Sequence, residues 1–274
     1  MTKARILADY VAGGTTAAEF DYLDGLTSAA VGINDTQTLS NKTFVAPALG
    51  TPASGNISNT TGGGGLKSMQ VFTSSGTWTK PSGIFTIKIF ITAGGGGGGG
   101  GTSGNNMGAG GGAGGTAIKV LDVTDITTCT VVVGSYGAGG AAQNDGVAGG
   151  TSSFAKLAGS GSFTTVSSSG GFKGGTANST YGNRGGVGSN GDINIYGGYG
   201  GAQGAHASVD EIGGGHGGAS YWGGGGKSAS TWYNLLATTG DAYGSGGGGG
   251  QHGADAEAVG MRGQAGIVVV EEYS

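Results

Sequence analysis

The stretch Ile84-Phe-Thr-Ile-Lys-Ile-Phe-Ile91, followed two residues later by the polyglycine run Gly94–Gly101, decides the fold of this chain. In its first part, large apolar residues alternate with Thr86 and Lys88, which is the pattern of a β-strand with one buried face. We expect that face to carry Phe85, Ile87, Ile89 and Ile91. The glycine run offers no side chain to a core, so the sequence predicts a sheet that passes directly into a region packed by other means.

Glycine is concentrated in one part of the chain. Of the 274 residues, 70 are glycine, and 58 of these lie between positions 94 and 266. With only 3 prolines, the chain cannot be collagen, which needs abundant proline as well as glycine at every third position. A net charge of −4 and the lack of a basic run argue against a nucleic-acid partner.

Further strand patterns flank the glycine-rich region on both sides. They cover Met69–Thr73, Thr77–Pro81, Thr116–Val123, Thr128–Val133 and Gly266–Tyr273. The last of these has a run of four apolar residues that requires burial against the earlier strands. We therefore predict a mainly β domain over residues 67–274, built as a small antiparallel β-sandwich. Its strands lie near 68–92, 116–134 and 266–273, and it carries a glycine-rich lobe at 134–265.

The sequence allows two alternative structures for the lobe. One is a disordered glycine linker, which is disfavoured because aromatic residues from Phe154 to Tyr233 are scattered through it. The other is a bundle of polyglycine or polyproline-II-type helices with three residues per turn, joined laterally by amide-to-carbonyl hydrogen bonds. Glycines at 182, 185, 188, 191, 197 and 200 follow that period. In such a bundle the residues that interrupt the glycines lie at turns.

The N-terminal part, residues 1–61, is poor in glycine. Thr16-Ala-Ala-Glu19 is a capping box that predicts a short helix. Asn34–Ser54 is extended and rich in threonine, and it has too few large apolar residues for a core of its own. It is either a flexible linker or a stalk that becomes ordered by winding with copies of itself.

No catalytic or metal-binding pattern exceeds what chance provides in this composition. Gly223–Ser228 resembles a phosphate-binding loop, but Tyr221 stands where the first glycine is required. The remaining candidates are the histidines His206, His216 and His252, the thiol of Cys129, and the acid pairs Asp122 with Asp125 and Asp210 with Glu211. The histidine spacings fit no zinc site, Cys129 alternates with valines as a buried strand residue does, and nothing positions the acids. We expect no enzyme activity and no cofactor.

Two global signals concern location. The first ten residues lack the apolar stretch of a secretory signal, and no apolar run approaches the ~18 residues of a membrane span. We therefore expect neither a cleaved leader nor insertion into a membrane. A single cysteine also excludes an intrachain disulfide.

Several motifs together resemble bacteriophage tail fibres. Val71-Phe-Thr-Ser-Ser-Gly-Thr-Trp-Thr-Lys-Pro81, followed by Gly94–Gly101 and closed by Gly266–Tyr273, resembles the glycine-rich domain of phage fibre proteins. The N-terminal motifs that resemble tail-fibre segments are Ala18–Ser28, Asp35–Thr43 and Gly50–Gly55. The composition is also similar to that of the distal adhesins of T-even-type phages, in which stacked polyglycine helices present variable loops.

This resemblance implies a homotrimeric virion tail fibre that acts at the host cell surface. The N-terminal segment, with its short helix and trimeric stalk, would attach to other tail or baseplate proteins. Loops of the lobe would bind a bacterial surface glycan or an outer-membrane protein through aromatic and histidine side chains. The residues expected to make this contact are Tyr196, Tyr199, His206, His216, Tyr221, Trp222, Trp232 and Tyr233. The alternatives are a purely structural fibre or decoration protein, and an ice-binding protein, for which the irregular loops are unsuited.

Overall fold

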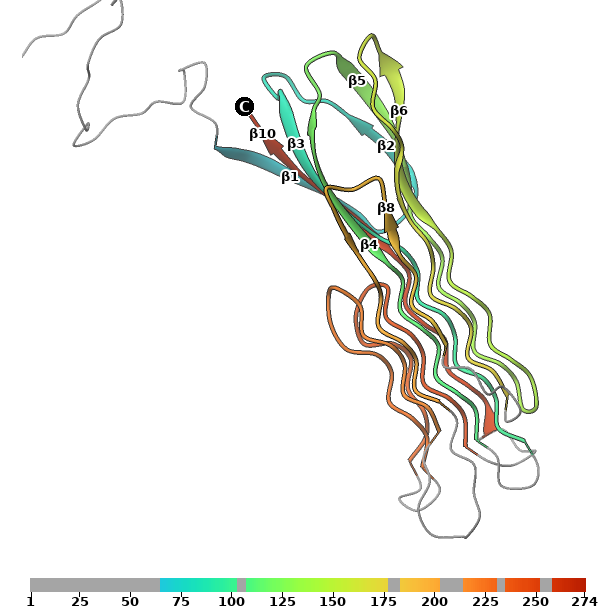
Figure 1. The fold of residues 1–274 in the computed structure, drawn as a ribbon. Coiled ribbons are helices and arrows are strands. Elements are labelled where there is room, and N and C mark those ends of the chain that lie inside the picture. The colour runs from blue at the N-terminus through green and yellow to red at the C-terminus, as the bar shows by residue number, and fades with distance from the viewer. Residues whose placement is uncertain (1–64, 103–106, 177–182, 203–213, 231–234, 252–257) are drawn as a thin grey trace, which may run out of the picture. The chain divides into compact units, whose positions relative to one another are not determined.

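The computed structural model describes residues 65–102, 107–176, 183–202, 214–230, 235–251 and 258–274. The chain divides into two compact units, Met1–Gly55 and Asn56–Ser274, and the described residues all belong to the second. The short helix and stalk predicted within residues 1–61 lie outside the described residues. In the second unit two β-sheets pass into a lobe of glycine-rich segments (Figure 1).

Two five-stranded antiparallel sheets form the β part, which confirms the prediction of a mainly β, sandwich-like fold. Sheet A has the order β1-β10-β3-β4-β9, and sheet B has the order β2-β5-β6-β7-β8. The strands of sheet A are β1 (Leu66–Phe72), β10 (Ile267–Tyr273), β3 (Thr86–Thr92), β4 (Thr116–Asp122) and β9 (Ile193–Ile195). Those of sheet B are β2 (Gly76–Thr79), β5 (Ile126–Val132), β6 (Ser152–Gly159), β7 (Val166–Ser168) and β8 (Gly188–Ser189). The C-terminal strand β10 therefore lies between β1 and β3 and joins them into one sheet.

A hydrophobic core fills the space between the sheets. From β3 it takes Ile87, Ile89 and Ile91, each fully buried, and from sheet B it takes Trp78 and Phe154. Complete burial of one such side chain stabilises the fold by about 1.5–3 kcal/mol. The other large members are Ile84, Leu121, Val123, Ile126, Val131, Val166, Val268 and Val270.

Phe85 departs from the expected pattern. The sequence places it on the same face as the three isoleucines, but it is 47% exposed. It precedes the first residue of β3, where its amide donates to the carbonyl of Tyr273 and its carbonyl accepts from Val123. The preceding residue, Ile84, is instead 3% exposed and belongs to the core, so the alternation of buried and exposed residues breaks between Ile84 and Ile87.

Two buried serines join the sheets at the point where β3 ends. The hydroxyl of Ser152 donates to the carbonyl of Thr92 at 2.8 Å and accepts from the amide of Gly134 at 2.9 Å. The hydroxyl of Ser168 donates to the carbonyl of Ile91 at 2.7 Å. These serine hydroxyls therefore provide hydrogen-bond partners for backbone amide and carbonyl groups at the point where the strands pass into glycine-rich segments.

The glycine-rich segments continue the strands and lie beside one another (Figure 1). Segment 93–101 follows β3, and its nine amides donate hydrogen bonds of 2.7–3.1 Å to three neighbouring segments in turn. The first partner is segment 144–150, where Gly94, Gly97 and Gly100 donate to the carbonyls of residues 150, 147 and 144. The second is segment 258–264, where Gly95, Gly98 and Gly101 donate to residues 264, 261 and 258. The third is segment 109–115, where Ala93, Gly96 and Gly99 donate to residues 115, 112 and 109. The bonding pattern thus repeats every three residues.

The carbonyls of the same segment bind three further neighbours. Gly95 and Gly98 accept from Gly137 and Gly140, while the carbonyl of Gly94 accepts from Gly171. The carbonyls of Gly96 and Gly99 accept from Gly247 and Gly250. Segment 93–101 therefore bonds to six others, and segment 107–115 behaves in the same way. Both lie in the lobe, although the sequence prediction begins the lobe at residue 134.

Close backbone approach explains why these segments are glycine. A methyl group added at Gly97 would lie 2.0 Å from the carbonyl oxygen of Ala138. One added at Gly111 would lie 2.1 Å from the oxygen of Gly96. Such distances are far below van der Waals contact, so hydrogen-bonded backbones replace side chains as the packing element of the lobe.

Candidate functional site

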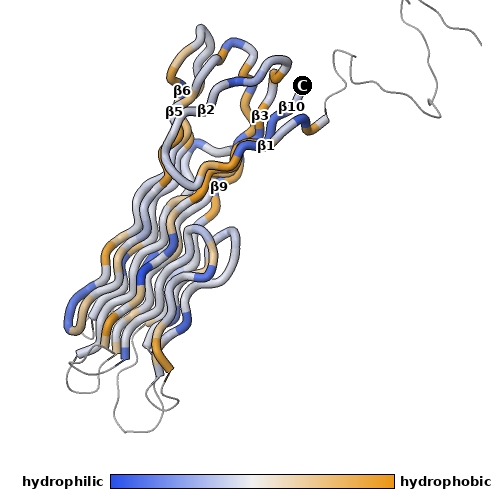
Figure 2. The backbone as a smooth tube through the Cα atoms, turned by 180° about the vertical axis from the view of Figure 1, so that it is seen from behind, coloured by the Kyte–Doolittle hydropathy of each residue, from blue (hydrophilic) through white to orange (hydrophobic). Residues whose placement is uncertain are grey.

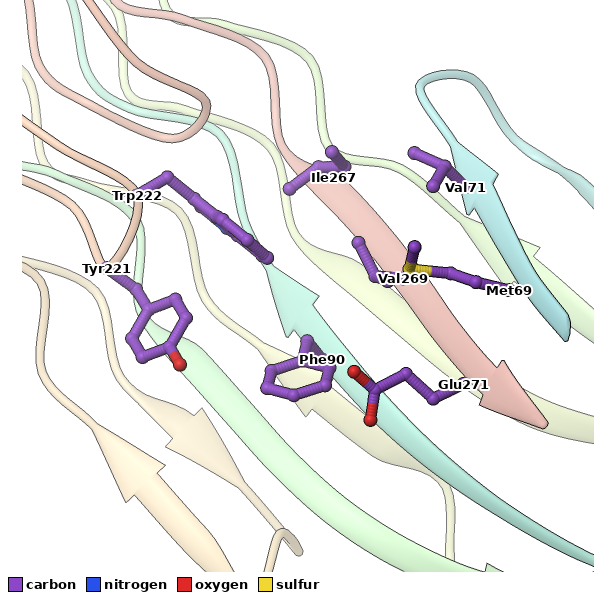
Figure 3. Close-up of a pocket in the computed structure, with 8 residues that line it drawn as sticks. All are labelled: Met69, Val71, Phe90, Tyr221, Trp222, Ile267, Val269 and Glu271. Atoms are coloured by element: carbon purple, nitrogen blue, oxygen red, sulfur yellow. The ribbon is translucent and has the colours of Figure 1, made fainter. Parts of the chain in front are cut away.

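A groove on the outer face of sheet A is lined by large apolar side chains (Figure 3). Its volume is about 430 Å³. Phe90, Ile267 and Val269 form its floor, and each is less than 10% exposed. The walls come from β1 on one side and from the turn that holds Tyr221 and Trp222 on the other. We call this feature the aromatic groove; its residues are Met69, Val71, Phe90, Tyr221, Trp222, Ile267, Val269 and Glu271.

A hydrogen bond and two ring contacts hold the turn against sheet A, and a third ring contact lies within the turn. The indole of Trp222 donates to the hydroxyl of Thr92 at 2.8 Å, and that hydroxyl shares a 2.8 Å hydrogen bond with Thr116. The Phe90 ring centroid lies 6.2 Å from that of Tyr221 and 6.3 Å from that of Trp222. The rings of Tyr221 and Trp222 meet edge to face at 5.1 Å. The groove wall is therefore fixed in place before any ligand arrives.

The charges beside the groove are one acid and one base. Glu271 accepts a 2.8 Å hydrogen bond from the hydroxyl of Tyr273, and this bond raises the pKa of the Tyr273 phenol. Lys88 is paired opposite Glu271 in the ladder, and its ammonium lies 4.8 Å from the Phe90 ring centroid. The groove is thus apolar and close to neutral overall.

The structure brings together only part of the predicted contact set. Tyr221 and Trp222 lie beside each other, 46% and 37% exposed, against the sheet. Tyr196 and Tyr199 are 66% and 60% exposed on segment 196–202. His216 is exposed on the adjacent segment, where its carbonyl accepts from Gly201 at 2.7 Å. The remaining three, His206, Trp232 and Tyr233, lie outside the described residues.

Tyr196 and Tyr199 form a second exposed aromatic feature. They are three residues apart, which matches the three-residue repeat of the hydrogen bonds. A helix with three residues per turn would place side chains at this spacing on the same side. The neighbouring segment runs antiparallel, because Gly198 bonds to Ala219 while Gly201 bonds to His216. Exposed tyrosines can therefore be presented in a row on a fixed backbone.

The ends of many glycine-rich segments meet at the far end of the lobe from the sheets. There the amide of Gly101 donates to Ala258, that of Gly108 to Gly250 and that of Ala109 to Gly175. These residues flank the intervals 103–106, 252–257 and 177–182, which lie outside the described residues. A described turn at the same end carries Gln143, whose φ is 67° and whose amide donates to Gly101.

Sequence reasoning missed most of the aromatic groove. Met69, Val71, Phe90, Ile267 and Val269 belong to strands that were expected, but none of them was named as a contact residue. One signal was available: Phe90 interrupts the polar face of the Ile84–Ile91 pattern. A large aromatic residue at such a position indicates that the second face of the strand is also covered.

Two of the groups considered for catalysis, Cys129 and Asp122, lie in strands of the β part. Cys129 is fully buried in β5, as the sequence predicts, and burial raises the pKa of its thiol to about 12. Asp122 accepts from Thr124 within its own turn, which lowers the pKa of the carboxyl. Within the described ranges, no three metal-ligating side chains gather at one place. The same ranges contain no helix with the length and hydropathy of a membrane span.

The fold and groove define a β-sandwich that extends into a hydrogen-bonded glycine lobe. The glycine-rich domain family matches residues 69–273, and the chain belongs to this family. No curated protein is similar enough in sequence to be matched with it.

Proposed function

We propose that this chain is a virion tail-fibre protein that attaches the particle to its host cell. The glycine-rich lobe serves as a rigid scaffold, and its loops bind a bacterial surface glycan or an outer-membrane protein. The residues before the domain associate into a trimeric stalk and join other tail or baseplate proteins. We expect binding without chemistry, and no cofactor.

The packing of the lobe supports the scaffold part of this proposal. We propose that its segments are polyglycine-II-type helices, because their hydrogen bonds repeat every three residues and link each central segment to six neighbours. Each bond contributes about 1 kcal/mol net, and many of them act together. Such a bundle holds its shape without large side chains, which leaves the aromatic residues free for recognition.

The exposure of Tyr196 and Tyr199 is the observation that carries the binding part. Two neighbouring tyrosines, 66% and 60% exposed on a hydrogen-bonded segment, offer flat faces for a sugar or a protein side chain. They lose little conformational freedom on binding, because their backbone is already fixed. The proposed contact set also includes His206, Trp232 and Tyr233, which lie outside the described residues.

Adsorption to host cells tests this function. We expect the double variant Tyr196→Ala with Tyr199→Ala to reduce binding of the purified chain to cells by about tenfold, as loss of a contact centre does. The control is Tyr243→Ala, since Tyr243 is 44% exposed but lies in another turn. A chain that binds no cells and does not block infection would instead be a purely structural fibre component.

A further inference from the structure

Exposed side chains on two neighbouring segments of the lobe follow the three-residue repeat of the hydrogen bonds. On segment 196–202 the exposed residues are Tyr196, Tyr199 and Ala202, and on segment 214–219 they are His216 and Ala219. The residues between them are buried or half-buried. Figure 2 shows the lobe segments side by side, mostly intermediate in hydropathy, with a few strongly hydrophilic stretches among them. Every third residue of these two segments therefore faces solvent.

The backbone register places two further exposed side chains next to Tyr199. Segment 183–187 runs antiparallel to segment 196–202, because the amides of residues 197 and 200 donate to the carbonyls of residues 186 and 183. This register sets the exposed Arg184 opposite Tyr199. Beyond it, the amide of Phe172 donates to the carbonyl of Arg184 at 3.0 Å, and the Phe172 side chain is 53% exposed.

Two segments continue this row on the other side of Tyr199. The amides of residues 198 and 201 donate to the carbonyls of residues 219 and 216, so His216 and Ala219 flank Tyr199. On the next segment, 224–230, the carbonyls of residues 226 and 229 accept from the amides of residues 217 and 214. The exposed Lys227 therefore lies opposite His216. We call this surface the lobe band; its residues are Phe172, Arg184, Tyr196, Tyr199, His216 and Lys227.

The lobe band carries positive charge on a chain that is acidic overall. The described residues of its five segments, 169–176, 183–187, 196–202, 214–219 and 224–230, contain two lysines, one arginine, one histidine and no acid. The whole chain, in contrast, has a net charge of −4. Cations gathered on one surface attract a ligand of the opposite charge, so the band is suited to an anion.

The acids nearest along the chain do not neutralise the band. Asp145 pairs with Lys173 at 2.9 Å, but no acid among the described residues forms an ion pair with Arg184 or Lys227. Asp241 is exposed on the segment beyond Lys227. It follows Thr238, the backbone partner of Lys227, by three residues, which is about 9 Å at ~3.1 Å per residue. Two cationic groups are thus available to a ligand.

The shape of the band favours a carbohydrate. Tyr196 and Tyr199 stand about 9 Å apart, at ~3.1 Å per residue, with only glycines between them. Rings separated in this way offer flat faces to successive sugars. The exposed residues beside them, Ala202 and Ala219, are small, so the band lacks the continuous apolar centre that a protein interface has.

We propose that the lobe band binds an anionic polysaccharide. Sugar rings stack on Tyr196 and Tyr199, and the carboxylate or phosphate groups of the polymer bind Arg184 and Lys227. The guanidinium group of Arg184 offers a fork of donors that fits either anion. Lys227 lies three segments away, about 14 Å at ~4.8 Å per segment, so a polymer with repeated charges engages both. This inference rests on the attachment function proposed above and names the ligand class of its tyrosine surface.

Two matched pairs of polymers test the ligand class with the full, unaltered chain. The pairs are polygalacturonate with its methyl ester, and phosphorylated dextran with plain dextran, and each pair differs only in the anion. We expect the charged member of at least one pair to bind about tenfold more tightly at about 0.15 M salt. The pair that responds distinguishes carboxylate from phosphate. Equal binding within both pairs, or no binding, would overturn the proposal.

A charge-matched pair of variants tests the location. We expect Arg184→Gln with Lys227→Gln to weaken binding of the charged polymer about tenfold, because two charge-assisted contacts are lost. The control is Lys67→Gln with Lys156→Gln, which removes two equally exposed charges from β1 and β6. Equal losses in the two variants would show attraction to the chain as a whole and would overturn the assignment to the band.

Salt dependence supplies a measurement that needs no variant. We expect binding of the charged polymer to weaken about tenfold between about 0.05 and 0.5 M salt, since exposed charges are screened over this range. Binding that does not change with salt would contradict a role for the two cations. Polyglutamate and oligothymidylate serve as anions without stacked sugars of this kind. If either bound as tightly as the charged polysaccharide, the carbohydrate class would be wrong.

Adsorption to host cells separates this inference from the attachment function. If Arg184→Gln with Lys227→Gln abolished polymer binding but left adsorption unchanged, attachment would stand and its ligand would not be an anionic polysaccharide. If the chain bound the charged polymers through the band but adsorbed to no cells, the ligand class would stand and the attachment function would fail.

Discussion

The indole of Trp78 donates a 2.7 Å hydrogen bond to the carboxylate of Glu272, and both side chains are buried between the two sheets. Glu272 also accepts from Gln70 at 2.7 Å and from the hydroxyl of Ser68. One carboxylate therefore joins β10 to the edge strand β1 of its own sheet and to β2 of the other sheet. A buried charge is tolerated here because several donors surround it.

Replacement of this carboxylate is expected to weaken the whole sandwich. In Glu272→Gln an amide group with its own hydrogens meets donors that need an acceptor, so we expect a loss of about 2–4 kcal/mol in the free energy of unfolding. Urea denaturation measures it. Glu271→Gln is the control, since Glu271 lies on the outer face, and it should change stability by less than about 0.5 kcal/mol. Equal effects would contradict the role given to Glu272.

The central glycines of the lobe should not tolerate even a methyl group. At Gly97 the added carbon would meet a backbone oxygen at 2.0 Å, and no flexible side chain is there to move away. We expect Gly97→Ala to cost more than about 3 kcal/mol. In the matched variant Gly224→Ala the new methyl group finds nothing within 4 Å, so stability should be nearly unchanged. Thermal denaturation of both variants tests this, and a wild-type melting curve for Gly97→Ala would contradict the packing.

The β part could be predicted from sequence because its signals are local. Alternation in β3 and the four apolar residues of β10 identify strands, and the return of the chain to its first sheet follows from the need to bury them. The neighbours of each glycine-rich segment could not be predicted in the same way. Gly97 bonds to Val147 and Gly174, and nothing in a run of identical residues specifies those partners.

The aromatic groove was difficult to foresee for a related reason. Tyr221 and Trp222 stand out in the sequence, but their partner Phe90 is about 130 residues earlier, on the face of β3 that was expected to be polar. The hydrogen bond from Trp222 to Thr92 places the turn beside the sheet rather than among the loops of the lobe. Long-range contacts of this kind leave no periodic trace in a single sequence.

The single thiol should make stability depend on pH in the alkaline range. Burial raises the pKa of Cys129 to about 12, whereas an unfolded cysteine ionises near about 8.5. The folded state then keeps a proton that the unfolded state loses, so the free energy of unfolding falls as pH rises above about 8.5. We expect a slope of about 1.4 kcal/mol per pH unit that is absent in Cys129→Ala. Urea titrations at several pH values measure it, and a thiol reagent should label Cys129 only in denaturant.

An acid in the lobe should produce the opposite dependence, at low pH. Asp145 pairs with Lys173 at 2.9 Å and accepts from the amide of Thr176 at 2.8 Å, and these contacts hold the pKa of its carboxyl below the usual range. A lowered pKa means that the carboxylate stabilises the fold above the pKa of an unfolded aspartate, about 3.9, and that this contribution is lost as pH falls through the lower folded value. The two contacts join neighbouring segments near the far end of the lobe.

Hydrogen exchange at single amides tests this local effect directly. We expect the protection factor of the Thr176 amide to fall several-fold below about pH 4, and to be equally low at neutral pH in Asp145→Asn. Asp192→Asn is the matched control, because Asp192 holds the amide of Val120 at 2.9 Å and pairs with Lys119 in sheet A. It should expose Val120 to exchange and leave Thr176 protected. If both variants loosened both amides, the lobe and sheet A would open as one cooperative unit, and the local role of Asp145 would be wrong.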